Sequence, residues 1–242
     1  MKMYRLIASM ALGGILATSL SARVILDRGH MDLVFEFDDG AWEAEVELHG
    51  VGEYEPEDVV LQANMNTLQQ RPAGAAFNFL GAEGSLVNIL PEVDPGAPYD
   101  RLWIGFEVED EEGAFLNNQA TLTFSNFVTP NGGDMFLWQE DALGNPVLYF
   151  SSDMGFPGAG SFVYDDLTLE DHAHFNWAFT EFGDYLADIT ITADLTGGGQ
   201  TSITETYAFQ AIPEPSTYAV IVGALVLGVV LLRRRGFGGS RA

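Results

Sequence analysis

Residues 42–49 read Trp-Glu-Ala-Glu-Val-Glu-Leu-His, so that apolar and polar side chains alternate along the whole stretch. Successive side chains of a β-strand point to opposite faces, and this period of two therefore places the apolar set on one face and the carboxylates on the other. The stretch is predicted to be an antiparallel strand with one buried face. No stretch between residues 23 and 211 keeps a sustained helical period.

The same alternation recurs along the chain, with turn-forming residues between its occurrences. It is clear in residues 185–195 and around Leu122 and Phe124. Shorter candidate strands are residues 31–37, 59–63, 86–90, 102–108, 135–138, 147–150, 174–179 and 202–209. Many short strands separated by turns predict an all-β fold, an immunoglobulin-like β-sandwich, with residues 71–84 as an irregular excursion.

The amino-acid composition excludes several classes of function. The 242 residues include 35 Asp and Glu against 10 Lys and Arg, which gives a net charge of −25. Nucleic-acid binding needs clustered basic side chains, so nucleic acid is excluded as a partner. The absence of cysteine excludes disulfides, thiolate metal ligands and a cysteine nucleophile. No serine-hydrolase or zinc-protease motif is present, and we expect a protein that is not an enzyme.

Residues 1–22 have the order of a secretory signal peptide. Lys2 and Arg5 precede an apolar run that ends at Leu20, and small residues follow it. We expect signal peptidase to remove this segment and the mature chain to be exported. An uncleaved N-terminal anchor is the alternative.

Residues 212–242 form a second sorting segment, in which the motif Pro213-Glu214-Pro215 precedes an uncharged stretch at 217–232 and the cluster Arg233-Arg234-Arg235. The uncharged stretch suits a short membrane helix, and the arginines act as a stop-transfer signal that prefers the cytoplasmic side. This tripartite tail resembles the PEP-CTERM sorting signal of Gram-negative bacteria. The resemblance implies transient anchoring in the inner membrane, cleavage by an exosortase, and display of residues 23–211 on the cell surface, on the outer membrane or in the extracellular matrix. An ordinary C-terminal membrane anchor is the alternative.

Two short motifs contain three of the four histidines: His30-x-Asp32 and His172-x-His174. In an extended chain, residues two apart share a face, so each motif presents two ligand atoms together. Pairing between the two strands would unite three imidazoles and one carboxylate. This set suits Zn²⁺, Mn²⁺ or another first-row divalent ion better than Ca²⁺. The alternative is that these histidines are hydrogen-bonded structural residues near strand ends.

Two further ligand classes stay open from the sequence. Acidic loops such as residues 107–112 supply oxygen ligands for Ca²⁺, although none follows the calcium-loop motif. Trp103, Trp138 and Tyr149 are either core residues or a platform on which a sugar stacks. An extracellular glycan-binding or glycan-processing protein of the exopolysaccharide matrix, with polysaccharide as partner, is therefore the alternative function.

Several motifs between residues 29 and 195 resemble the choice-of-anchor M domain. They are Gly29-His30-x-Asp32, Asp38-Asp39-Gly40-x-Trp42, Tyr54-x-Pro56-x-Asp58-Val59-Val60, Phe79-Leu80-Gly81-x-x-Gly84, Leu90-Pro91, and His172-x-His174-x-Asn176-Trp177-x-Phe179-Thr180 with Gly183-x-Tyr185. That family is a surface domain with varied C-terminal anchors, and some relatives are associated with metal-type ABC transport systems. The resemblance implies a metal-handling or ligand-presenting surface protein. Residues 95–118 match the family poorly.

Overall fold

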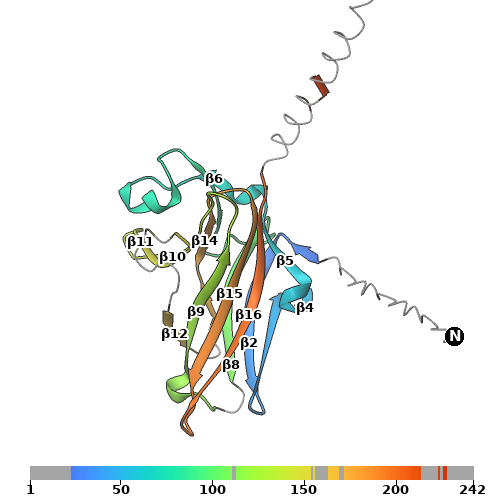
Figure 1. The fold of residues 1–242 in the computed structure, drawn as a ribbon, viewed down its shortest axis with the longest axis vertical. Coiled ribbons are helices and arrows are strands. Elements are labelled where there is room, and N and C mark those ends of the chain that lie inside the picture. Colours follow the sequence, from blue (N-terminus) through green and yellow to red (C-terminus); the bar gives the residue numbers. More distant parts are fainter. Residues whose placement is uncertain are drawn as a thin grey trace, which may run out of the picture.

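Figure 1 shows a computed structural model of the chain, which describes residues 23–110, 113–153, 155, 163–168 and 172–213, together with Gly223, Val226 and Leu227. The predicted signal peptide, Glu214 and Pro215 of the sorting motif, most of residues 217–232, and Arg233 to Arg235 lie outside the described residues. Among the described residues, no helix is both long enough and apolar enough to cross a membrane.

The described chain is mainly β-structure, arranged in three sheets. Sheet A has the strand order β1-β5-β16-β15-β9-β12, sheet B the order β13-β8-β2-β3-β4, and sheet C the order β11-β10-β14-β7-β6. The strands are β1 (Val24–Leu26), β2 (Gly29–Asp38), β3 (Ala41–Leu48), β4 (Gly52–Tyr54), β5 (Val59–Ala63), β6 (Leu68–Gln70), β7 (Leu86–Leu90), β8 (Leu102–Asp110), β9 (Gln119–Val128), β10 (Met135–Glu140), β11 (Pro146–Ser151), β12 (Val163–Thr168), β13 (His172–His174), β14 (Asn176–Phe179), β15 (Gly183–Asp194) and β16 (Gln200–Ala211). Short 3₁₀ helices lie between some of them: η1 (Pro56–Asp58), η2 (Met65–Thr67), η3 (Ala75–Leu80) and η4 (Leu116–Asn118).

The alternating stretches form strands as predicted. The stretch 42–49 supplies all of β3 but its first residue, and the stretch 185–195 supplies most of β15, each strand ending one residue before the stretch does. The predicted strands 59–63 and 86–90 coincide with β5 and β7. The prediction of one strand over 174–179 is wrong, because the chain changes sheets at the buried Phe175. Before it, β13 pairs with β8 in sheet B, and after it, β14 pairs with β10 and β7 in sheet C.

Residues 71–84, expected to be irregular, contain the 3₁₀ helix η3. Its Phe77, Phe79 and Leu80 are buried and pack with Phe136 and Trp138 as a small second core on sheet C. Trp138 is therefore a core residue, and its 1% exposure excludes it from a sugar-stacking surface.

The main core joins one face of sheet B to one face of sheet A. Leu33 and Phe35 of β2 and Phe106 of β8 belong to the same buried cluster as Phe124 of β9 and Ile189 of β15. Because side chains alternate along each strand, the polar residues of β2 and β8 lie on the opposite face of sheet B, away from this core. We call this the outer face of sheet B.

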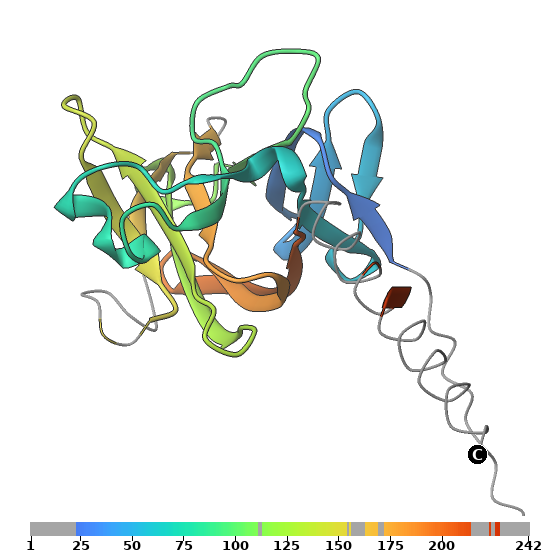
Figure 2. The same ribbon diagram turned by 90° about the horizontal axis from the view of Figure 1, so that it is seen from above.

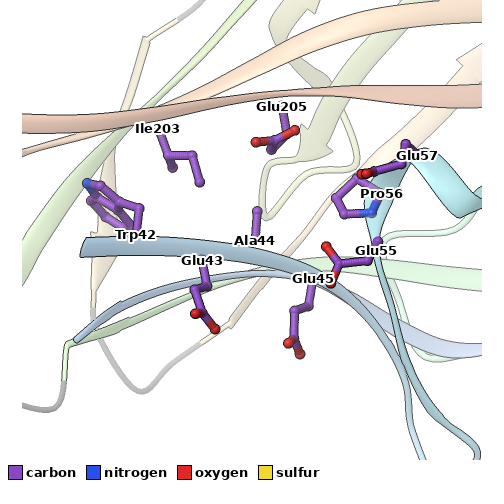
Figure 3. A pocket seen from close by; sticks show the side chains of 9 residues that line it. All are labelled: Trp42, Glu43, Ala44, Glu45, Glu55, Pro56, Glu57, Ile203 and Glu205. Carbon is purple, nitrogen blue, oxygen red and sulfur yellow. The ribbon is translucent and has the colours of Figure 1, made fainter. Parts of the chain in front are cut away.

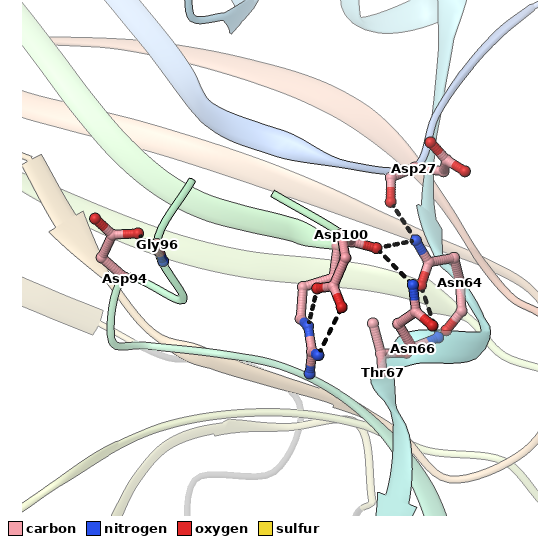
Figure 4. Close-up of polar contacts among 8 residues, drawn as sticks. Asp27, Asn64, Asn66, Thr67, Asp94, Gly96 and Asp100 are labelled. Atoms are coloured by element: carbon pink, nitrogen blue, oxygen red, sulfur yellow. Dashed lines mark hydrogen bonds and ion pairs between the residues drawn. The ribbon is translucent and has the colours of Figure 1, made fainter. Parts of the chain in front are cut away.

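Asn64 connects the starts of β2 and β8 through side-chain hydrogen bonds (Figure 4). Its Nδ2 donates to the carbonyl of Asp27, at 2.6 Å, and to the carbonyl of Asp100, at 2.9 Å. The amide of Gly29 donates to the carbonyl of Arg101, at 3.1 Å. These bonds support the parallel register of β2 and β8, in which His30 pairs with Trp103 and Asp32 with Gly105.

Candidate metal centre

The strand registers of sheet B bring the four predicted metal ligands together on its outer face. His174 of β13 lies opposite Gly105 of β8, and Gly105 lies opposite Asp32 of β2. His172 and His30 are each two residues away from these positions on the same faces of their strands. The two motifs therefore come together as predicted, but their strands do not pair directly, because β8 lies between β2 and β13.

The imidazoles of His30, His172 and His174 form a nearly equilateral triangle. Their ring centres are 5.4 Å (His30 to His172), 5.2 Å (His30 to His174) and 5.0 Å (His172 to His174) apart. One nitrogen of each ring lies within 4.8 Å of the others. With metal–nitrogen bonds of about 2.0–2.1 Å and a ring centre about 1.1 Å beyond the nitrogen, three imidazoles on a tetrahedral ion have ring centres about 5 Å apart. The triangle has the size of a three-histidine metal site.

Asp32 lies beside this group, since its ligand atoms group with those of His30 and with those of His172, and it is fully buried, with 0% exposure. Its Oδ2 is 2.6 Å from Nε2 of His49 and 3.4 Å from Nε2 of His30. Its Oδ1 has no hydrogen-bond partner among the described residues, and neither has Nε2 of His30 or of His174. Buried polar atoms are nearly always paired, so this cluster of unpartnered atoms indicates a place able to hold a cation.

Gly105 gives the carboxylate its room. A Cβ at this position would collide with Oδ1 of Asp32 and would lie 3.0 Å from Cε1 and 3.2 Å from Nε2 of His174. The side chains of Asp32 and His174 therefore approach each other over the bare backbone of β8, where a larger residue would separate them.

Stacking fixes the planes of two imidazoles without using their nitrogens. The ring of Trp103 stacks on His174, with 3.8 Å between centres and 9° between planes, and also contacts His30 at 4.2 Å. Nε1 of Trp103 donates to the carbonyl of Glu92, at 2.8 Å. His30 is covered on a further side by His49, at 3.9 Å and 13°. Trp103 thus forms a wall of the centre.

Burial keeps the imidazoles in the form that binds metals. It lowers the pKa of His174 to about 4, although the nearby carboxylate of Asp32 opposes the shift. Burial also lowers the pKa of His30, again against Asp32. The pKa of the Glu107 carboxyl group is raised, mainly because the group is buried and secondly because the negative charge of Asp32 is nearby. The shifts on both histidines favour neutral rings, whose nitrogens are available to a metal.

The structure adds two residues that the sequence analysis did not assign to this centre. Ligand atoms of His49 group with those of His30 and Asp32, and ligand atoms of Glu107 group with those of Asp32 and His172. The position of His49 could have been inferred from the turn at Asp39-Gly40. A two-residue hairpin turn there pairs Asp38 with Ala41, and the same register places residue 49 opposite residue 30. Glu107 was considered only as part of the acidic stretch 107–112 for Ca²⁺. Its place beside Asp32 had no signal in the sequence, because the parallel pairing of β2 with β8 joins strands far apart in sequence.

A second polar feature is the groove between β3 and β16, with a volume of about 390 Å³ (Figure 3). Trp42 and Ala44 face Ile203 across it, while Glu43 and Glu45 point to the other side of β3. Burial and neighbouring glutamates raise the pKa of Glu45 and, on the opposite strand, of Glu205. The glutamates of this groove are not among the groups of close metal-ligating atoms found in the described residues. The groove is therefore not assigned as a calcium site.

Comparisons of the chain with protein-family models, with curated proteins and with solved structures find no match. Function is therefore inferred from the residues of the centre, their chemistry, their spacing and their burial.

Proposed function

We propose that this protein binds one divalent transition-metal ion through His30, Asp32, His172 and His174 and does so as a non-enzymatic surface protein. The observation that carries the proposal is the convergence of all four histidines of a 242-residue chain at one place. Three of their rings have the spacing of a tetrahedral site, and beside them lies the buried carboxylate of Asp32, whose Oδ1 has no partner among the described residues. Three imidazoles and one carboxylate suit Zn²⁺ or Mn²⁺ better than Ca²⁺.

A bound ion would neutralise Asp32 and accept the lone pairs of the imidazoles. Its ligands come from β2 and from β13, which both pair with β8, so ligation would clamp three neighbouring strands. Because a metal that binds the folded chain adds its binding free energy to the stability, the ion would also stabilise the domain.

We also propose that the domain is exported and displayed on the surface or in the extracellular matrix of a Gram-negative bacterium. The signal peptide at 1–22 and the tail with Pro213-Glu214-Pro215 support this, with signal peptidase and an exosortase as processing partners. The common core of sheets A and B supports a β-sandwich. The immunoglobulin-like form of this sandwich and its choice-of-anchor M type are proposed from the sequence motifs. A polysaccharide partner remains a prediction from the sequence.

The metal proposal is tested by elemental analysis and by thermal melts with Zn²⁺, Mn²⁺ or a chelator. We expect one equivalent of metal in the wild type. At a free metal concentration of 100 times Kd, stability should rise by about 2.7 kcal/mol, which corresponds to roughly 5–10 °C in Tm. His172→Ala should lose this response. Gly105→Ala removes no ligand but crowds Oδ1 of Asp32, and it should lose most of the response too.

Glu43→Gln is the control, since Glu43 is an exposed acid on the polar face of β3 and belongs to none of the ligand groups. This variant should respond to metal like the wild type. Sub-stoichiometric metal together with identical melts under every condition would leave the histidines as structural residues only.

A further inference from the structure

The two carboxylate oxygens of Asp32 have different surroundings. Oδ2 lies 2.6 Å from Nε2 of His49, and because a carboxylate can only accept, the imidazole N–H donates. Among the described residues Oδ1 has no partner, and it lies over Gly105, near His174. One oxygen is thus held by the protein, and the other is left for an ion.

His49 is itself fixed by three contacts. Its backbone amide donates to the carbonyl of His30, at 3.1 Å, and its ring lies flat on the ring of His30. Its Nε2 also lies 4.0 Å from Oε2 of Glu47. The imidazole therefore meets Oδ2 of Asp32 with a defined position and plane.

The position of His49 differs from that of the three ligand histidines. Its ring centre is 3.9 Å from that of His30, with 13° between the planes, whereas the ring centres of His30, His172 and His174 are 5.0–5.4 Å apart. Two imidazoles that share a tetrahedral ion have ring centres about 5 Å apart. The geometry fits stacking and a hydrogen bond to Asp32, rather than a fourth imidazole ligand.

We infer that His49 is a positioning residue that sets the metal specificity of the centre, an inference that rests on the proposed function. By holding Oδ2 it limits Asp32 to one metal bond through Oδ1. Three imidazoles and one carboxylate oxygen then make a four-coordinate site, which suits Zn²⁺. Mn²⁺ prefers more oxygen ligands in octahedral geometry and is disfavoured while Asp32 cannot chelate through both oxygens.

The test is a pair of competition titrations, with Zn²⁺ and with Mn²⁺, on the full chain as wild type, His49→Leu and His49→Gln. Loss of a hydrogen-bonding partner of a metal ligand weakens metal binding by roughly 10–100-fold. We expect His49→Leu to lose that much Zn²⁺ affinity and little Mn²⁺ affinity, so that the ratio of the two affinities falls at least about tenfold. His49→Gln keeps an N–H donor and should restore most of the ratio. Glu43→Leu, on the polar face of β3, the strand that directly precedes His49, should leave both affinities unchanged.

Three other outcomes have separate meanings. Equal losses of Zn²⁺ and Mn²⁺ affinity in His49→Leu would overturn the specificity role and leave His49 as a packing residue. X-ray absorption spectra of the zinc-loaded protein that count one imidazole fewer in His49→Gln than in the wild type would make His49 a ligand and overturn the inference. A wild type that binds neither metal would overturn the proposed function, and the inference with it.

Discussion

Gly105 and Asp32 are neighbours in the register of β8 and β2, and the centre depends on this pair as much as on its histidines. Any Cβ at residue 105 would meet Oδ1 of Asp32, so the missing side chain leaves room for the buried carboxylate. Within a strand, glycine has no side chain to pack and weakens the element, and it often marks a close approach of other groups. Here the approaching groups are a carboxylate and an imidazole.

At the residue scale, we expect the metal-free protein to lose stability as the pH falls from about 7 towards 5. Burial lowers the folded-state pKa of His174 to about 4 and also lowers that of His30, while an unfolded histidine titrates near 6.5. Between these values the unfolded chain binds more protons than the folded chain, so stability rises with pH in this window and is lost as pH falls through it. Urea denaturation at about pH 7.5 and about pH 5.5 measures the difference.

His174→Gln is the comparison for this pH effect. The variant keeps a polar side chain but has no imidazole at residue 174, and it should show a smaller loss of stability over the same interval. An equal loss in both proteins would show that His174 is not the source. The interval from about pH 7.5 to about pH 5.5 lies above the range in which ordinary carboxylates titrate, so they contribute little to the change in stability.

At the scale of elements, the starts of β2 and β8 depend on one buried side chain. Asn64 is only 4% exposed, and its Nδ2 donates to the carbonyls of both Asp27 and Asp100. Asn64→Leu leaves both acceptors without this donor, and buried unpaired polar groups cost about 1–3 kcal/mol. We expect urea denaturation to show a loss of this size, together with weaker metal binding because the register of β2 and β8 loosens.

Asn66→Leu provides the matched control. Asn66 also donates to the carbonyl of Asp100, at 2.9 Å, but it is exposed, so water can replace the lost donor. Its stability should change by less than about 0.5 kcal/mol. Equal effects in the two variants would contradict the role given to burial at Asn64.

At the scale of the whole molecule, the acidic residues lie almost entirely between the two predicted sorting segments, with only Glu214 inside the second. All 35 acidic residues lie between residues 23 and 215, and the tail beyond them carries only arginines as charged groups. We expect intact-mass analysis of the protein from cell envelopes to show a form without residues 1–22 and without residues 217–242. A chain in which Pro213 and Pro215 are replaced by alanine should keep its tail. A wild-type mature form that still contains residues 217–232 would contradict processing and leave surface anchoring possible.

The sequence by itself determined most of the strands, although not β1, β4, β6 or β12, because side-chain alternation is a local property that needs no knowledge of neighbours. It also placed His30 with Asp32 and His172 with His174, since residues two apart share a face of a strand. The turn at Asp39-Gly40 is also sufficient to place His49 opposite His30, because a two-residue hairpin fixes the register of the strands that it joins.

Only the tertiary structure decided that β8 lies between β2 and β13, which places Gly105 under the carboxylate and Trp103 against two imidazoles. It also decided that the chain leaves sheet B at Phe175, where the alternation continues without a break. The physical reason is that pairing between strands distant in sequence follows from burial of whole sheet faces in the common core. No single stretch of residues contains that information.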